Sequence, residues 1–233
     1  MDSLAVPQEL IADTDWDQLK VFFGPGQESG GVRPVDELLT VLAQGVPAQQ
    51  ARAVRELGEV INHQCSVAEA TAPAILVVAA LLRHPATASV MLPADLYRNP
   101  PPRPLRAELL ELIGSVTADV GQVAEESARR FGFPPTPAQL AVRATRPALF
   151  AVVRDLLDDP DPDPDPDIRH AAARAIMPLL EDPELAPHGP VLRPRAKAIA
   201  ADLPHHRPLG WPCLDISADI PAIPRSFDEP PPW

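Results

Sequence analysis

The sequence contains little cysteine and few aromatic side chains: two cysteines and 4% aromatics in 233 residues. Cys65 and Cys213 lie far apart and show no metal-ligand spacing, so we expect no disulfide framework and a reducing compartment. The scarcity of aromatics and a net charge of -12 disfavour nucleic acid as a partner. Proteins that bind nucleic acid carry clustered Lys and Arg and often stack bases on aromatic rings.

Long apolar runs are also missing. The longest, residues 74–82, ends at Arg83 and is far shorter than the roughly 20 residues of a membrane-spanning helix. It predicts a helix that is buried on all sides within a folded protein. Residues 1–17 are acidic and contain neither a basic leader nor a continuous apolar region, so no signal peptide is expected. Together these features predict a cytoplasmic protein without a membrane segment.

Proline is abundant, with 32 residues that fall mainly between segments of helical periodicity. Because proline interrupts helices, these positions indicate where helices begin and end. No segment alternates as a strand would, so the sequence predicts an all-α protein of about seven helices. The helices are expected over residues 35–44, 47–61, 67–83, 105–130, 137–157, 168–179 and 192–203, with the 137–157 segment kinked or divided at Pro147.

Two proline-rich segments are expected to be loops. Residues 85–104 form a connection longer than compact domains usually contain. In residues 158–167, aspartate and proline alternate, which predicts a stiff, exposed stretch, with Asp167 as the cap of the helix that follows. The predicted organisation is an irregular segment at 1–34, a helical body at 35–203 and a non-helical, proline-rich tail at 204–233.

The chain resembles the HEAT-repeat, armadillo-like family, and more narrowly a bacterial HEAT-like group, at two places. The first is His63-Gln64 followed by Ala70-Thr71-Ala72-Pro73, and the second is Asp165-Pro166-Asp167-Ile168-Arg169-His170-Ala171-Ala172. The resemblance covers roughly residues 35–203. It implies a short right-handed α-solenoid of HEAT-like helical hairpins, in which each hairpin buries its apolar face against its neighbours. The long proline loop and the Asp-Pro stretch depart from the family pattern.

No catalytic motif accompanies these features: the sequence has no phosphate-binding glycine loop, serine nucleophile elbow or zincin helix. His63 and Cys65 are two residues apart and would not face each other on a helix. His205, His206 and Cys213 lack the paired spacing of zinc ligands. The aspartates of the Asp-Pro stretch lack the glycine of a calcium loop. The protein is therefore expected not to be an enzyme and to need no cofactor.

Binding of a protein partner is the leading hypothesis. One interpretation of His63 and Gln64 is structural, as side chains that satisfy free backbone groups at a helix end or inter-helix turn, and the other is that they contact a partner. Asp161, Asp163 and Asp165 are the further candidate partner-binding residues. A narrower version is an immunity or neutralising protein for a basic partner, which an acidic surface would steer. The alternatives are a HEAT-like DNA glycosylase acting on alkylated bases and, last, a lyase-like accessory protein of bilin chemistry.

Overall fold

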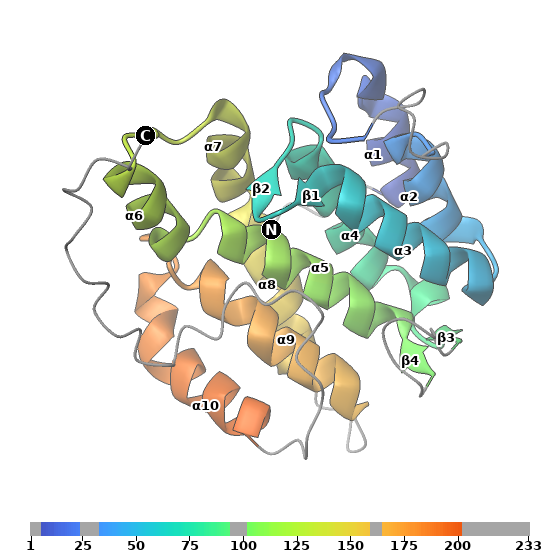
Figure 1. Ribbon diagram of the computed structural model, residues 1–233. Coiled ribbons are helices and arrows are strands. Elements are labelled where there is room, and N and C mark those ends of the chain that lie inside the picture. The colour runs from blue at the N-terminus through green and yellow to red at the C-terminus, as the bar shows by residue number, and fades with distance from the viewer. Residues whose placement is uncertain (1–5, 24–32, 94–101, 159–164, 202–233) are drawn as a thin grey trace, which may run out of the picture.

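The structure is a computed structural model that describes residues 6–23, 33–93, 102–158 and 165–201. α-Helices dominate these residues, which confirms the all-α class predicted from the sequence. The helices are α1 (Pro7–Asp13), α2 (Val35–Gln44), α3 (Pro47–Ile61), α4 (Thr71–Arg83), α5 (Leu105–Asp119), α6 (Gln122–Arg130), α7 (Pro137–Ala144), α8 (Arg146–Leu157), α9 (Pro166–Leu179) and α10 (Gly189–Ala201). Figure 1 shows their arrangement.

Short elements connect these helices. Three single 3-10 turns occur, at η1 (Trp16–Gln18), η2 (Pro85–Thr87) and η3 (Ala186–His188). Two small antiparallel hairpins pair β1 (Asn62–His63) with β2 (Ser66–Val67) and β3 (Met91–Leu92) with β4 (Arg103–Pro104). The sequence predicted none of these strands, because a two-residue strand is too short to show alternation. Residues 1–34, expected to be irregular, contain α1 and η1.

Prolines begin several helices where the sequence placed them. Pro47 stands in the first turn of α3, where its missing N–H costs no helical hydrogen bond. α4 is buried on nearly all sides, as its continuous apolar sequence predicted. It begins at Thr71 rather than at residue 67, because the residues before it form the β1–β2 hairpin. The Thr71 hydroxyl accepts the N–H of Ala68 at 2.8 Å and donates to the carbonyl of Ile61, which fixes the hairpin to the start of α4.

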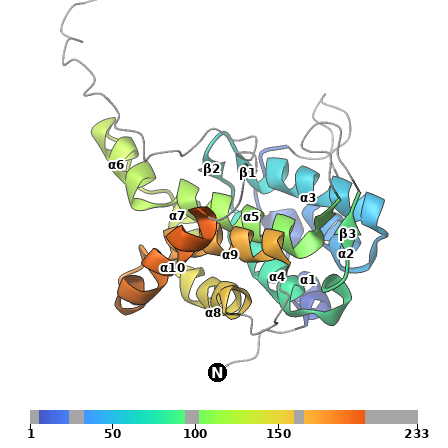
Figure 2. The same cartoon turned by 90° about the horizontal axis from the view of Figure 1, so that it is seen from below.

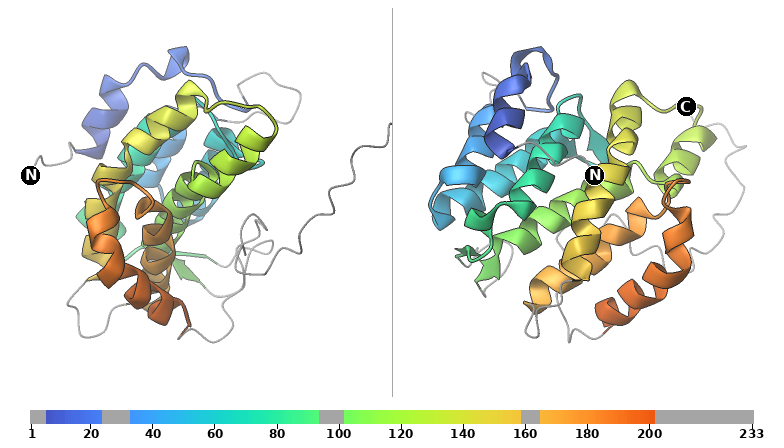
Figure 3. Two further views of the ribbon diagram at one scale, coloured as in Figure 1. Left: turned by 90° about the vertical axis from the view of Figure 1, so that its left-hand side faces the viewer. Right: turned by 180° about the vertical axis from the view of Figure 1, so that it is seen from behind.

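The pair α5 and α9 forms the centre of the molecule. The two helices pack together more extensively than any others, although three helices separate them in sequence. At their contact, a Cβ on Gly114 would lie 3.2 Å from the Cα of Ala175, so the small residues allow a close approach. α8 and α10 pack on α9, and α4 packs on both α5 and α8 (Figure 3). The core is thus built from distant segments as well as from hairpins of neighbours such as α2–α3.

The predicted helix over residues 105–130 is wrong in one respect, since it is divided into α5 and α6 at Val120 and Gly121. The helical spacing of apolar residues over this range predicts one buried stripe that includes Leu109, Ile113, Val116 and Val123. The first three are buried in α5, as predicted, but Val123 is 48% exposed. The predicted division near Pro147 is confirmed, because α7 ends at Ala144 and Pro147 stands in the first turn of α8. The tail at 204–233 lies outside the described residues.

Candidate functional site

The His63-Gln64 pair lies in the β1–β2 hairpin, which directly follows α3 and connects it to α4, as predicted for an inter-helix turn. Gln64 and Cys65 form its two-residue turn, and their φ angles are 49° and 58°. Positive φ at both central residues is the geometry of a type I′ turn, which Asn and Gly usually adopt because other side chains are strained there. The hairpin therefore holds Gln64 at an exposed tip in a conformation that its own side chain does not favour.

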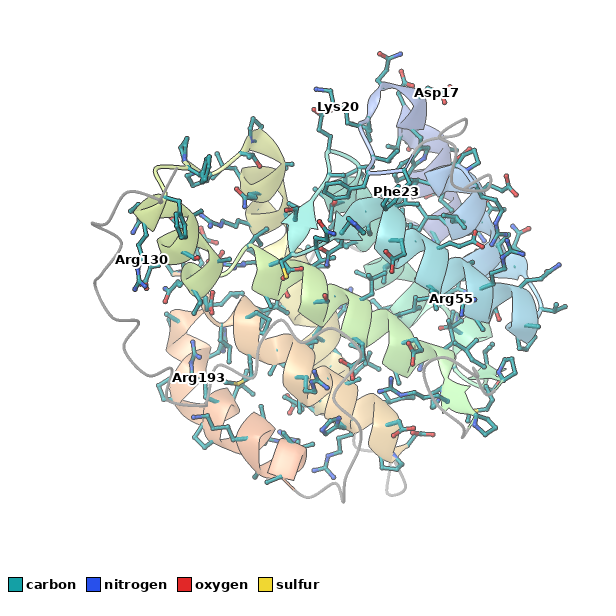
Figure 4. All side chains as sticks on the ribbon, in the orientation of Figure 1. Asp17, Lys20, Phe23, Arg55, Arg130 and Arg193 are labelled. Atoms are coloured by element: carbon teal, nitrogen blue, oxygen red, sulfur yellow. The ribbon has the colours of Figure 1, made fainter. Side chains whose placement is uncertain are left out.

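The His63 side chain packs against two aromatic residues from the N-terminal segment. Its ring meets Phe23 edge to face at 4.7 Å between centroids, and Phe22 lies 6.1 Å away. Its Nδ1 lies 3.2 Å from Oε2 of Glu59, one turn earlier in the chain. These contacts favour a structural role for His63, whose side chain is 27% exposed. Figure 4 shows Phe23 above α3, beside the hairpin.

Cys65 is disulfide-bonded in the structure. The expectation of no disulfide is therefore wrong. The only other cysteine of the sequence, Cys213, lies outside the described residues.

A small polar cluster lies beneath the hairpin, where β1 meets the end of α5. Nδ2 of Asn62 donates to Oγ of Ser115 at 3.2 Å, and the Asn62 side chain also hydrogen-bonds the carboxyl of Asp119. Burial raises the pKa of Asp119, and the hydrogen bond from Asn62 offsets this only in part. Oδ1 of Asn62 is buried without a hydrogen bond, so it is an acceptor that a protonated Asp119 could satisfy.

A second cluster, made of charged side chains, joins the start of α5 to α9. Arg103 pairs with Glu108 at 2.7 Å and with Glu111 at 3.2 Å, and Arg174 approaches Glu111 at 3.8 Å. Burial desolvates Arg103, but the two carboxylates outweigh this and raise its pKa. Burial also raises the pKa of Glu111, despite its two cationic neighbours. Glu111 lies on α5 and Arg174 on α9, so their ion pair links the two helices.

Of the three candidate aspartates, only Asp165 lies within the described residues. It is the N-cap of α9, and its Oδ1 accepts the N–H of Asp167 at 2.9 Å. The prediction that Asp167 is the cap is therefore wrong by two residues, because Pro166 occupies the first helical turn and places the cap before it. Asp161 and Asp163 lie outside the described residues.

Side chains from later parts of the chain form hydrogen bonds with the backbone where α5 ends and α6 begins. The carbonyl of Val120 accepts hydrogen bonds from Nε of Arg143 at 2.8 Å and from Nη2 of Arg146 at 3.2 Å. The carboxylate of Glu181 accepts the N–H of Gln122 at 2.8 Å, at the start of α6. These contacts satisfy the free backbone groups at both helix ends and explain why the helix divides here.

The C-terminus of α6 is capped as well. Gly132 has φ of 80°, its N–H donates to the carbonyl of Arg129 at 3.0 Å, and the N–H of Phe133 donates to that of Ala128 at 3.0 Å. This pair of bonds is a Schellman motif, in which glycine readily adopts the left-handed conformation. α6 is thus a short but well-defined helix, which an isolated peptide of this length would not form in water.

Although α6 is well capped, none of its side chains is buried. Figure 2 shows it standing out from the other helices. The segment 122–140 carries half of the large apolar side chains that are exposed among the described residues: Val123 at 48%, Phe131 at 75%, Phe133 at 66% and Leu140 at 52%. We call this segment the α6–α7 surface. This surface was not predicted from the sequence, because Phe133 precedes prolines that indicate only a break between helices; two phenylalanines around Gly132 were the available signal.

No family model, curated protein or solved structure matches this chain. The likeness to HEAT repeats therefore rests on the quoted sequence motifs. None of the helices in the described ranges is long and apolar enough to cross a membrane. Within the same ranges, no three His, Cys, Asp or Glu side chains are grouped so that they could hold a metal ion.

Proposed function

We propose that the protein is a non-enzymatic scaffold that binds a protein partner through the α6–α7 surface. The observation that carries this proposal is the exposure of Phe131 and Phe133 on a segment that is well ordered by caps yet covers no core. Large apolar side chains gathered on the surface of a folded protein usually mark a binding site. Aromatic rings contribute most of the binding energy in many protein interfaces.

A helical repeat architecture supports the same function, because solenoids commonly present extended binding surfaces. The hairpin α2–α3 and the successive packing of α8, α9 and α10 support a HEAT-like arrangement. The α5–α9 pairing departs from a simple stack, in which each hairpin contacts only its sequence neighbours. We therefore propose a solenoid in which α5 and α9, which are distant in sequence, pack against each other at the centre.

A narrower proposal is that the partner is basic and is steered by the acidic residues of the chain. More than half of the net negative charge lies outside the described residues, with Asp161 and Asp163 among those residues. For such a partner, the association rate should fall markedly as salt rises, because the screening length is about 8 Å near physiological ionic strength.

The experiment compares the proteins that co-purify with the wild type and with a double variant, Phe131→Ser and Phe133→Ser, from the native cell. Val191→Ser is the matched control, because Val191 is 72% exposed but lies on α10. We expect a partner to be recovered with the wild type and the control and lost with the double variant. Each buried ring should contribute about 1.5 kcal/mol, so the purified partner should bind the double variant at least about 100-fold more weakly.

Equal recovery of the same proteins by all three forms would contradict the role of the α6–α7 surface. Circular dichroism and thermal unfolding of the variants check that the fold is intact. Tight binding of duplex DNA with a steep salt dependence would instead support the alternative function, a HEAT-like DNA glycosylase for alkylated bases.

A further inference from the structure

The outward stripe of α6 carries an apolar, an acidic, a hydroxyl and a basic side chain. Val123, Glu126, Ser127 and Arg130 follow the spacing of one helical face, and all four are exposed. On the other side, Ala124 and Ala128 are partly covered, and Glu125 is held by Arg143 at 2.8 Å. Arg130 points away from the body (Figure 4).

The charges of this stripe are ordered, with the acidic residue before the basic one. Glu126 and Arg130 have no ion-pair partner among the described residues, whereas the neighbouring Glu125 pairs with both Arg129 and Arg143. When two copies of such a stripe lie antiparallel, the acidic half of each copy faces the basic half of the other. The stripe therefore fits a second copy of itself that runs antiparallel.

The register of such a pair follows from the two-fold axis. Positions at equal distances on either side of the axis face each other between the two copies. With the axis on the outward side of α6 at the level of Ala128, Glu126 of one copy lies level with Arg130 of the other. In the same register, Val123 lies near the turn that ends α6 in the second copy, where Phe131 and Phe133 are exposed.

We propose that a second copy of this chain occupies the α6–α7 surface, with the two α6 helices antiparallel about a two-fold axis near Ala128. This inference rests on the proposed function, because it names the occupant of the same surface. It is an alternative to the narrower proposal of a basic partner, since a second copy carries the same net charge of -12. Each dimer contains two symmetric Glu126–Arg130 pairs and two contacts of Val123 with the exposed phenylalanines of the turn after α6. The contact extends over about 14 Å of helix per copy, which is short for a protein interface, so the dimer should be weak.

An order of acid before base also stabilises a single helix, through its dipole and through pairing one turn apart. The experiment must separate that effect from pairing between copies. Sedimentation equilibrium of the full chain, from micromolar to near-millimolar concentration, gives the dissociation constant of the dimer. The variants are Glu126→Arg and Arg130→Glu, each studied alone and in an equimolar mixture, and Glu184→Arg is the control for the same charge change far from α6.

Each single variant turns both attractive pairs of the dimer into like-charge pairs. We expect its dissociation constant to rise about 10- to 30-fold, while Glu184→Arg leaves the value unchanged. In the mixture, the two arginines of the Glu126→Arg chain face the two glutamates of the Arg130→Glu chain, so both cross-copy pairs are attractive again. Heterodimers should therefore form at concentrations where each variant alone is monomeric. Mixing does not alter pairing within either helix, so this recovery can only arise between copies.

Phe133→Ser is a second, uncharged variant, and it should weaken the dimer at all salt concentrations. A wild type that stays monomeric over the whole range would overturn the proposal, as would a mixture that stays monomeric while the wild type dimerises. A monomeric wild type whose partner is lost in the double phenylalanine variant would reject self-pairing and leave the proposed function standing. A wild-type dimer with partner recovery unchanged in that variant would reject the proposed function and leave self-pairing.

Discussion

The close approach of α5 and α9 can be tested by comparing two glycines in equivalent settings. Gly58 in α3 and Gly114 in α5 both lie inside a helix and are both partly buried. They differ in what an added Cβ would meet: at Gly58 the nearest atom is Cδ1 of Leu112 at 3.8 Å, and at Gly114 it is Cα of Ala175 at 3.2 Å. The first is an ordinary contact, and the second requires backbone to move.

The expected free energies of unfolding follow from these distances. Alanine is about 1 kcal/mol more favourable than glycine inside a helix, so Gly58→Ala should stabilise the protein by about that amount. Gly114→Ala gains the same helix preference, but overpacking against α9 costs roughly 1–3 kcal/mol. The net effect should lie between neutral and about 2 kcal/mol destabilising, and Gly114→Leu should be worse than Gly114→Ala.

Urea and thermal unfolding followed by circular dichroism measure the difference. For a chain of this size, 1 kcal/mol corresponds to about 2–4 °C in Tm, so the two alanine variants should differ by several degrees. If Gly114→Ala stabilises the protein as much as Gly58→Ala does, then α5 and α9 are not in close contact at this point, and the central packing described here is wrong.

Three further predictions concern buried side chains. Ile113→Asp places a charge in the fully buried core of α5 and should cost several kcal/mol; a melting curve like that of the wild type would contradict the predicted facing of α5. Thr71→Val keeps the shape of the side chain but removes two hydrogen bonds, the one that the hydroxyl accepts from Ala68 and the one that it donates to Ile61, so urea unfolding should show a loss of about 1–3 kcal/mol. Because the folded pKa of Asp119 is raised, its contribution to stability is present below about pH 4 and is lost as pH rises through that higher pKa. Asp119→Asn should therefore stabilise the protein near pH 7 but not near pH 3, since its amide can also donate to Oδ1 of Asn62; an equal effect at both pH values would exclude a raised pKa as the cause.

The sequence by itself determined the helix boundaries that depend on proline and the helices whose burial follows from composition. Pro47 and Pro147 stand in the first turns of α3 and α8 because their missing N–H and fixed φ act locally, whatever the surroundings. The burial of α4 followed in the same way, since a helix without a polar face has no side to expose.

Tertiary structure alone decided the division at Gly121, the packing of α5 on α9 and the exposure of α6. Arg143, Arg146 and Glu181, which satisfy the backbone groups at the division, come from helices and a turn far along the chain. A periodic pattern records which side chains of one helix share a face, but not which distant residues reach its ends. For that reason Val123 matched the apolar stripe of one long helix in sequence, and yet it lies on the surface of a second helix that points away from the core.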